Sequence, residues 1–146
     1  MSRFTFILNP NAGKGTGRKL SKQIHEIVRS KTSDFELLET SQRGDAAEIA
    51  RSSSSPTVVA VGGDGTIHEI ANGIIGTEKV LGVIPVGSGN DFIKAIRVPR
   101  DLRLSISTIF QGRVKTIDVG SVRISLAHGD GNQNDSADSF FVNGLG

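Results

Sequence analysis

The chain has 146 residues, enough for one domain with a hydrophobic core, and its formal net charge is only +2. The absence of cysteine excludes disulfides and thiolate chemistry, and the absence of tyrosine and tryptophan removes the aromatic platform typical of single-strand nucleic-acid binders. No apolar stretch approaches the roughly 20 residues of a membrane span, and no signal peptide is visible. We therefore expect a cytoplasmic protein with no nucleic-acid partner.

Alternating strands and helices are predicted through the first part of the chain. Runs of β-branched and other apolar residues predict strands at 4–8, 35–38, 57–61 and 81–84. Apolar residues at helical spacing follow them, at 16–28, 46–50, 67–75, 92–96 and 104–110. Asp45 and Asp101 are candidate helix caps. This alternation predicts an α/β fold with a parallel sheet.

The pattern changes after Gly112. Three further strands are predicted at 114–119, 122–127 and 140–142, and a polar hairpin loop over 128–138 joins the last two. This change predicts a different kind of structure in the last part of the chain.

Three glycine-rich loops follow the strands at 4–8, 57–61 and 81–84. They read Asn-Pro-Asn-Ala-Gly-Lys-Gly, Gly-Gly-Asp-Gly-Thr and Pro-Val-Gly-Ser-Gly-Asn. Because the carboxyl ends of parallel strands share one edge of a sheet, we expect the loops to converge there. Glycine lets backbone amides approach a phosphate without an obstructing Cβ, and a helix start adds its positive dipole end. Asp64 would place a carboxylate where Mg²⁺ or the proton of a nucleophile needs one.

Spacing excludes two common phosphate motifs. A P-loop needs a glycine five residues before the Gly13-Lys14 pair, and Leu8 stands there. The dinucleotide fingerprint needs a glycine where Arg18 or His68 stands.

Positive charge is concentrated at the start of the chain. Residues 1–31 contain seven lysines and arginines against Glu26 alone. Such a basic unit suits an anionic ligand or an anionic membrane surface.

The three loops, in this order and spacing, resemble the catalytic domain of the diacylglycerol kinase family, which includes bacterial lipid kinases and the sphingosine and ceramide kinases. Thr40 and the Gly44-Asp45-Ala46 segment also fit the family pattern, and the resemblance runs from Asn9 to about Asn143. It implies a three-layer, parallel-sheet nucleotide-binding domain like those of 6-phosphofructokinases and NAD kinases. Gly-Gly-Asp-Gly alone is shared with those enzymes and indicates only the superfamily.

The resemblance implies ATP-dependent phosphorylation of a lipid hydroxyl, with Mg²⁺ as cofactor. Asp64 is then the candidate catalytic residue and the metal ligand, directly or through water. The residues expected at the nucleotide are Asn9, Pro10, Asn11, Ala12, Gly13, Thr40, Gly62, Gly63, Asp64, Gly65, Thr66, Ile67, His68, Glu69, Gly87, Ser88, Asn90 and Asp91. Ser88 stands where the family more often has threonine, and His68 where asparagine is common.

Family members usually run to roughly twice this length, in keeping with two domains. The second is a β-sandwich that supplies part of the lipid site and a general base. We therefore expect an α/β ATP-binding domain at 1–113, and strands at 114–146 that lead into a sandwich that is missing or truncated. The family also implies a homodimer, and the basic start of the chain suits peripheral contact with the inner membrane face.

Two alternatives stay open. One is an NAD kinase-like enzyme, although the Asn-Pro-x-Ala-Gly start and the Gly-Ser-Gly-Asn-Asp-Phe loop argue against it. The other is a nucleotide-binding module without catalysis.

Overall fold

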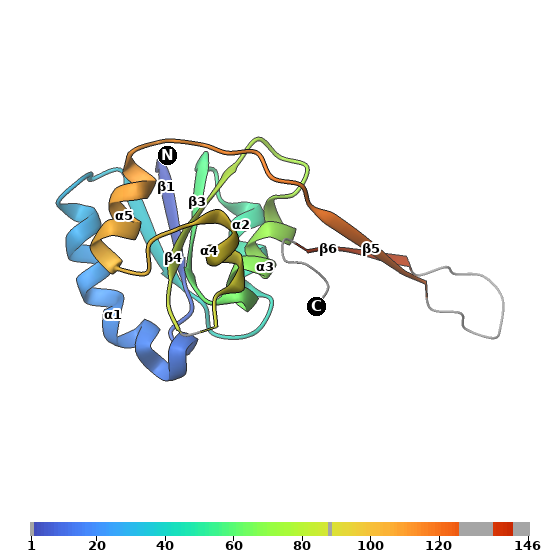
Figure 1. Cartoon of the computed structure of the whole chain (residues 1–146), viewed down its shortest axis with the longest axis horizontal. Helices are drawn as coiled ribbons and strands as arrows, with labels where there is room; N and C mark the ends of the chain where they lie inside the picture. Colours follow the sequence, from blue (N-terminus) through green and yellow to red (C-terminus); the bar gives the residue numbers. More distant parts are fainter. Residues whose placement is uncertain (1, 88, 126–135, 142–146) are drawn as a thin grey trace.

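The computed structural model describes residues 2–87, 89–125 and 136–141, which form a layered body and a hairpin that projects from it (Figure 1). The elements in chain order are β1 Phe4–Leu8, α1 Ala12–Arg29, β2 Phe35–Glu39, α2 Asp45–Ser52, β3 Thr57–Gly62, α3 Asp64–Ile74, β4 Val80–Pro85, α4 Asp91–Ile96, α5 Leu102–Phe110, β5 Gly120–Ser125 and β6 Ser136–Phe141. The strands and helices predicted up to Phe110 are all present, with ends shifted by a few residues.

The body is built on a four-stranded sheet in the order β2-β1-β3-β4. Every pairing in it is parallel, with Phe4 of β1 opposite Phe35 of β2 and Thr57 of β3. The predicted parallel sheet is therefore confirmed. In this order the loops after β1, β3 and β4 leave neighbouring strands at the same edge.

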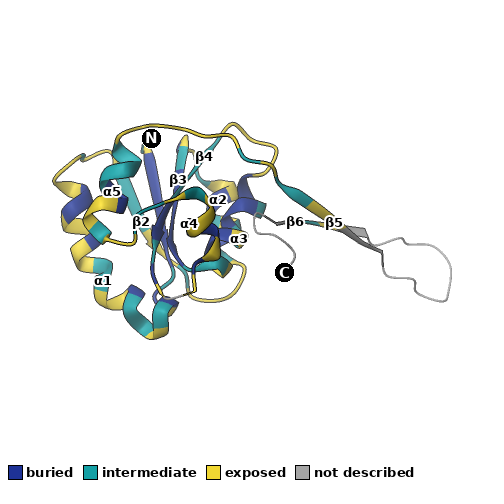
Figure 2. Ribbon diagram, in the orientation of Figure 1, coloured by how far each residue is buried: buried dark blue, intermediate teal, exposed yellow. Residues whose placement is uncertain are grey.

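Helices cover both faces of this sheet, which gives three layers (Figure 1). Side chains alternate between the faces along each strand. On one face Phe6, Leu8 and Val59 pack in a core cluster with residues of α1 and α5. On the other face Ile7 and Val58 pack with residues of α2, α3 and α4. The buried band of β1 and β3 in Figure 2 reflects this double coverage.

The start of α1 contains a kink. Gly13, Lys14 and Gly15 have φ values of 61°, 56° and 88°, so regular helix begins only after Gly15. This agrees with the helix start predicted near Thr16, and it leaves the loop after β1 as an irregular segment beside the sheet edge.

The strand predicted at 114–119 is wrong. This segment follows α5 as an unpaired stretch that crosses over the body to the hairpin (Figure 1). Ile117 packs against the cluster on the α2–α3 side, while Val114 is 67% exposed. A strand needs a hydrogen-bonding partner, and the described residues provide none for this segment.

The hairpin of β5 and β6 is antiparallel, with Ser121 opposite Phe140. β6 begins at Ser136, inside the stretch predicted as a loop, so that part of the loop prediction is wrong. The rest of the predicted loop, and residues 126, 127 and 142 of the predicted strands, lie outside the described residues.

Within the described parts of the chain, none of the helices combines the length and the apolar character needed to cross a membrane.

Candidate functional site

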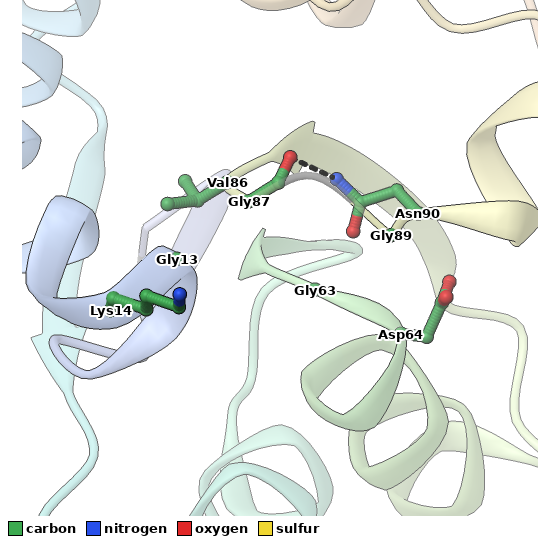
Figure 3. A pocket seen from close by; sticks show the side chains of 8 residues that line it. All are labelled: Gly13, Lys14, Gly63, Asp64, Val86, Gly87, Gly89 and Asn90. Carbon is green, nitrogen blue, oxygen red and sulfur yellow. Dashed lines mark hydrogen bonds between the residues drawn. The ribbon is translucent and has the colours of Figure 1, made fainter.

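A cavity of about 300 Å³ lies at the carboxyl edge of the sheet. It is lined by Gly13, Lys14, Gly63, Asp64, Val86, Gly87, Gly89 and Asn90. Figure 3 shows these residues arriving from three directions, on the loops that follow β1, β3 and β4. The three loops expected to converge therefore do meet, and glycine backbone forms much of the wall.

Two glycines bring the first and third of these loops into contact. Gly13 has a φ of 61° and Gly87 a φ of 112°, which side-chain-bearing residues rarely adopt. A Cβ built on Gly13 would lie 3.1 Å from both Cα and N of Gly87. The two backbones thus touch at one side of the cavity, and a side chain at position 13 would have to push the Gly87 backbone away by a few tenths of an ångström.

Asn9 stabilises the loop after β1. Its Nδ2 donates to Thr66 Oγ1 at 3.3 Å, and its Oδ1 accepts from the Asn11 backbone N–H at 3.0 Å. A Cβ on Gly17 of α1 would collide with the Asn9 carbonyl oxygen, so the helix can approach only because residue 17 is glycine. Of the predicted residues 9–13, only Gly13 lines the cavity, while Asn9 holds the loop in place through its side-chain hydrogen bonds.

Asp64 joins the second loop to the third. It is the first residue of α3, and its carboxylate accepts the backbone N–H groups of Asp91 at 3.0 Å and Phe92 at 3.3 Å. These amides begin α4 and have no partner inside their own helix. Each carboxylate oxygen has a second lone pair, so Asp64 can organise α4 and still bind a cation or a hydroxyl.

The third loop is held by Asn90, whose side chain is buried. Its Nδ2 donates to the Gly87 carbonyl at 3.4 Å, as Figure 3 shows. Asp91 forms an exposed ion pair with Lys94 at 2.9 Å, and the Lys94 ammonium lowers the pKa of the Asp91 carboxyl. Asp91 does not line the cavity, and Ser88 lies outside the described residues.

The remaining predicted nucleotide residues are not among those that line the cavity. The Ile67 side chain is fully buried in the core, and Glu69 Oε2 accepts from the Gly44 N–H at 3.1 Å. The Thr40 N–H donates to the Leu8 carbonyl at 2.9 Å and extends the pairing of β1 with β2. Contact of these residues, and of His68, with a nucleotide stays a prediction.

The expected helix cap at Asp45 is wrong. Gly44 holds the cap position, and Asp45 is the first residue of α2. Its carboxylate accepts from the Ser41 N–H at 2.8 Å, the Ser41 hydroxyl at 2.7 Å and the Gln42 N–H at 3.0 Å. These hydrogen bonds lower the pKa of the Asp45 carboxyl, and the two from Ser41 contribute most. Asp101 is the expected cap of α5, accepting from the Leu104 N–H at 2.9 Å.

Lys14, Val86 and Gly89 line the cavity but were not among the predicted nucleotide residues. Three residues outside the lining, which hold elements in place, were not predicted either. Gly17 and Gly73 lie inside helices, where glycine costs about 1 kcal/mol relative to alanine. A glycine kept inside a helix despite this cost indicates that another backbone packs closely against it. A Cβ on Gly73 would collide with the Ala47 carbonyl of α2. Asn72 of α3 bonds to Phe140 of β6, 68 residues away, and no local pattern indicates such a contact.

Known proteins of one family are similar to this chain over most of its length. The family model described as the diacylglycerol kinase catalytic domain matches residues 3–122. The "Diacylglycerol kinase" of Bacillus subtilis (strain 168) is 34% identical over 128 residues, covering 84% of this chain and 42% of that protein. The "Probable lipid kinase YegS-like" of Klebsiella pneumoniae (strain 342) is 32% identical over 127 residues, covering 84% and 43%.

A solved structure is similar as well. The crystal structure of a diacylglycerol kinase from Bacillus anthracis str. Sterne matches with a TM-score of 0.74 and 28% identity, over 84% of this chain and 47% of that one. The chain thus spans less than half the length of the relatives that it matches. The fold is the NAD kinase-like α/β fold that diacylglycerol kinases have. With the family model matching most of its length, the chain belongs to the diacylglycerol kinase catalytic domain family.

Proposed function

We propose that this chain is the nucleotide-binding part of an ATP-dependent lipid kinase. The observation that carries the proposal is the glycine-walled cavity with one carboxylate, at the carboxyl edge of a parallel sheet, in a member of this family. The names of the relatives, diacylglycerol kinase and lipid kinase, support a lipid hydroxyl as the acceptor.

The cavity wall suits the phosphates of ATP. Gly13, Gly63, Gly87 and Gly89 present backbone without side chains, so phosphate oxygens can come close to the main chain. α3 begins at the cavity and directs the positive end of its dipole toward it. Lys14 in the cavity wall can pair with a phosphate oxygen.

The residues present also fit Mg²⁺. This ion prefers oxygen ligands and is usually held by one or two carboxylates together with waters and substrate phosphates. Among the described residues no group of three or more acidic, histidine or cysteine side chains could hold a metal by itself. Asp64 would therefore share the ion with the phosphates, and when bound the ion neutralises their charge.

Transfer then depends on positioning. The lipid hydroxyl oxygen forms a bond to the γ-phosphorus, the bond to the β-phosphate oxygen breaks, and ADP leaves. The three loops would hold the phosphates in line, and Asp64 would orient them or the hydroxyl. We place the group that accepts the hydroxyl proton in the part of the longer protein that follows this chain, as the family resemblance implies.

Peripheral contact with an anionic membrane surface belongs to the same proposal. Arg18 and Lys19 of α1 are exposed on the layer that begins beside the cavity. The test is co-sedimentation of the complete protein with phosphatidylglycerol vesicles, with phosphatidylcholine vesicles as control. Binding should weaken as salt is raised, because the attraction is electrostatic. Analytical ultracentrifugation tests the homodimer that the resemblance implies.

Titration calorimetry of this chain with Mg-ATP tests the nucleotide site, and saturable one-to-one binding is expected. Absence of binding would contradict the proposal. For the complete protein, transfer of labelled γ-phosphate to diacylglycerol in mixed micelles is compared with transfer to NAD. Transfer to NAD alone would favour the NAD kinase-like alternative, and nucleotide binding without transfer to any acceptor would favour the non-catalytic module.

A further inference from the structure

The β5–β6 hairpin is joined to the body through an asparagine side chain. Asn72 Nδ2 donates to the Phe140 carbonyl at 2.7 Å, and Asn72 Oδ1 accepts from the Phe140 N–H at 2.8 Å. The same Nδ2 donates to the His68 carbonyl of its own helix at 2.9 Å. Both amide protons and the carbonyl of Asn72 are therefore used, and the orientation of the side chain is fixed.

The contact fits the pairing of the hairpin. Along an antiparallel pair, alternate residues turn their N–H and C=O away from the partner strand. Phe140 lies opposite Ser121 of β5 and offers both groups to Asn72 on the outer edge of β6. The Asn72 carboxamide thus takes the place that one residue of a third strand would occupy.

The helix that carries Asn72 also carries one wall of the cavity. α3 begins at Asp64, eight residues before Asn72, a separation of about 12 Å along a regular helix. Gly73 packs directly against the Ala47 carbonyl of α2, so α3 is held at this turn. The position of Phe140 is therefore fixed relative to the phosphate cavity through a short, rigid element.

We propose that Asn72 is a positioning residue, which sets where β6 stands relative to the phosphate cavity. The catalytic part of this inference rests on the proposed kinase function. The relatives are more than twice as long as the matched segment. The proposed function places the acceptor-binding part in the portion of the longer protein beyond this hairpin. A lipid hydroxyl presented from there must meet the γ-phosphate, and displacements near 1 Å are costly in such transfers.

Amide hydrogen exchange on this chain tests the contact itself. In Asn72→Ala the Phe140 amide should lose protection by about tenfold or more, while amides of β1 and β3 keep theirs. Alanine is the best helix former, so α3 should not be weakened by its own propensity. Asn72→Asp keeps the side-chain volume and an acceptor for the Phe140 N–H, but its second oxygen would face the Phe140 and His68 carbonyls that the Asn72 amide now bonds. This repulsion should displace the side chain, so the Phe140 amide should lose protection here too. Gln23→Ala, which removes an exposed amide side chain from α1, is the matched control.

Kinetics of the complete protein test the positioning role. Both Asn72 variants should lower kcat for lipid phosphorylation by about tenfold and leave the Kd for Mg-ATP within about twofold, because they misplace the acceptor and spare the cavity. Unchanged exchange at Phe140 would overturn the contact. Unchanged kcat with altered exchange would overturn the positioning role. Absence of transfer by the unmodified protein would overturn the proposed function, and the exchange result would still decide the contact.

Discussion

The two ends of the four-stranded sheet are closed in opposite ways. At the amino end, side-chain hydroxyls form hydrogen bonds with one another and with a carboxylate. Thr5 Oγ1 lies 2.7 Å from Ser53 Oγ, 2.8 Å from Ser55 Oγ and 2.8 Å from Glu36 Oε1. Ser55 in turn donates to the Ser2 carbonyl at 2.7 Å. At the carboxyl end, glycines take the place of such side chains and leave a cavity of about 300 Å³.

This difference separates stability from binding. Buried polar groups need partners, and within the described residues no buried side-chain nitrogen or oxygen lacks one. At the amino end the partners are other residues of the same chain. At the carboxyl end the glycine backbone and Asp64 line the cavity. Substitutions at the amino end should therefore change the free energy of unfolding, and substitutions in the cavity wall should change what is bound or transferred.

The largest effect is expected for Asp64→Asn in the complete protein. Loss of the carboxylate should reduce phosphoryl transfer about 100-fold or more, because both charge neutralisation and hydroxyl orientation depend on it. The new carboxamide can still accept from one backbone N–H of α4 but not from both, so unfolding should become easier by only about 1 kcal/mol. Steady-state kinetics and urea denaturation measure the two effects. Transfer at the original rate would remove Asp64 from the mechanism.

A smaller effect is expected where the two glycine loops touch. Gly13→Ala should weaken Mg-ATP binding about tenfold, because the new Cβ pushes against the Gly87 backbone at 3.1 Å and moves the cavity wall. Gly15→Ala is the control, since residue 15 also has positive φ but nothing described lies within 4 Å of its Cβ position. Calorimetry compares the two variants. Equal losses would mean that backbone strain, and not the contact, explains the result.

The amino end provides the converse test. Thr5→Val removes a hydroxyl that bonds to Glu36, Ser53 and Ser55, and should lower the free energy of unfolding by about 1–3 kcal/mol. The Kd for Mg-ATP should not change. Thr57→Val is the matched control, because Thr57 pairs with Phe4 at the same end of the sheet and is only partly buried. A Thr5 variant that bound ATP more weakly would contradict the separation of the two ends.

The smallest effect concerns the loop after β2, which lies at the carboxyl end but outside the cavity wall. Hydrogen bonds from Ser41 lower the pKa of Asp45, so its stabilisation is present above the ordinary carboxyl pKa of about 3.9 and is lost as pH falls below it. Amide protection at Ser41 and Gln42 should fall over that acid range. Asp45→Asn should flatten this pH dependence, and Glu48→Gln should leave it unchanged.

Most of the body could be predicted from sequence because its signals are local. The apolar runs of β1 and β3 belong to strands buried on both faces, and the helical spacing in α3 belongs to one buried face. The 114–119 segment has the same β-branched character, but pairing depends on a partner strand, which composition does not supply.

The candidate site was predicted to the level of loops. Gly13, Gly63, Asp64, Gly87 and Asn90 line the cavity as the loop positions suggested. Asn9, Ile67 and Glu69 lie in the same motifs, but their side chains are used elsewhere. Asn9 donates to Thr66, Ile67 is buried in the core, and Glu69 accepts from the Gly44 N–H. A motif fixes which residues are near the site, and only the three-dimensional packing decides which of them face it.

The contact of Gly13 with Gly87 also limits how this protein can change. A side chain added at position 13 meets main-chain atoms of residue 87, and no side-chain substitution can remove main-chain atoms. Trimming a neighbouring side chain, the usual way in which a second mutation rescues an overpacked first one, can relieve the 3.2 Å approach to Thr16 Cβ but not the approach to the Gly87 backbone. In a saturation screen with a second-site suppressor search, substitutions at Thr16 should rescue Gly13 variants only in part, and fuller rescue should come from changes in loop length.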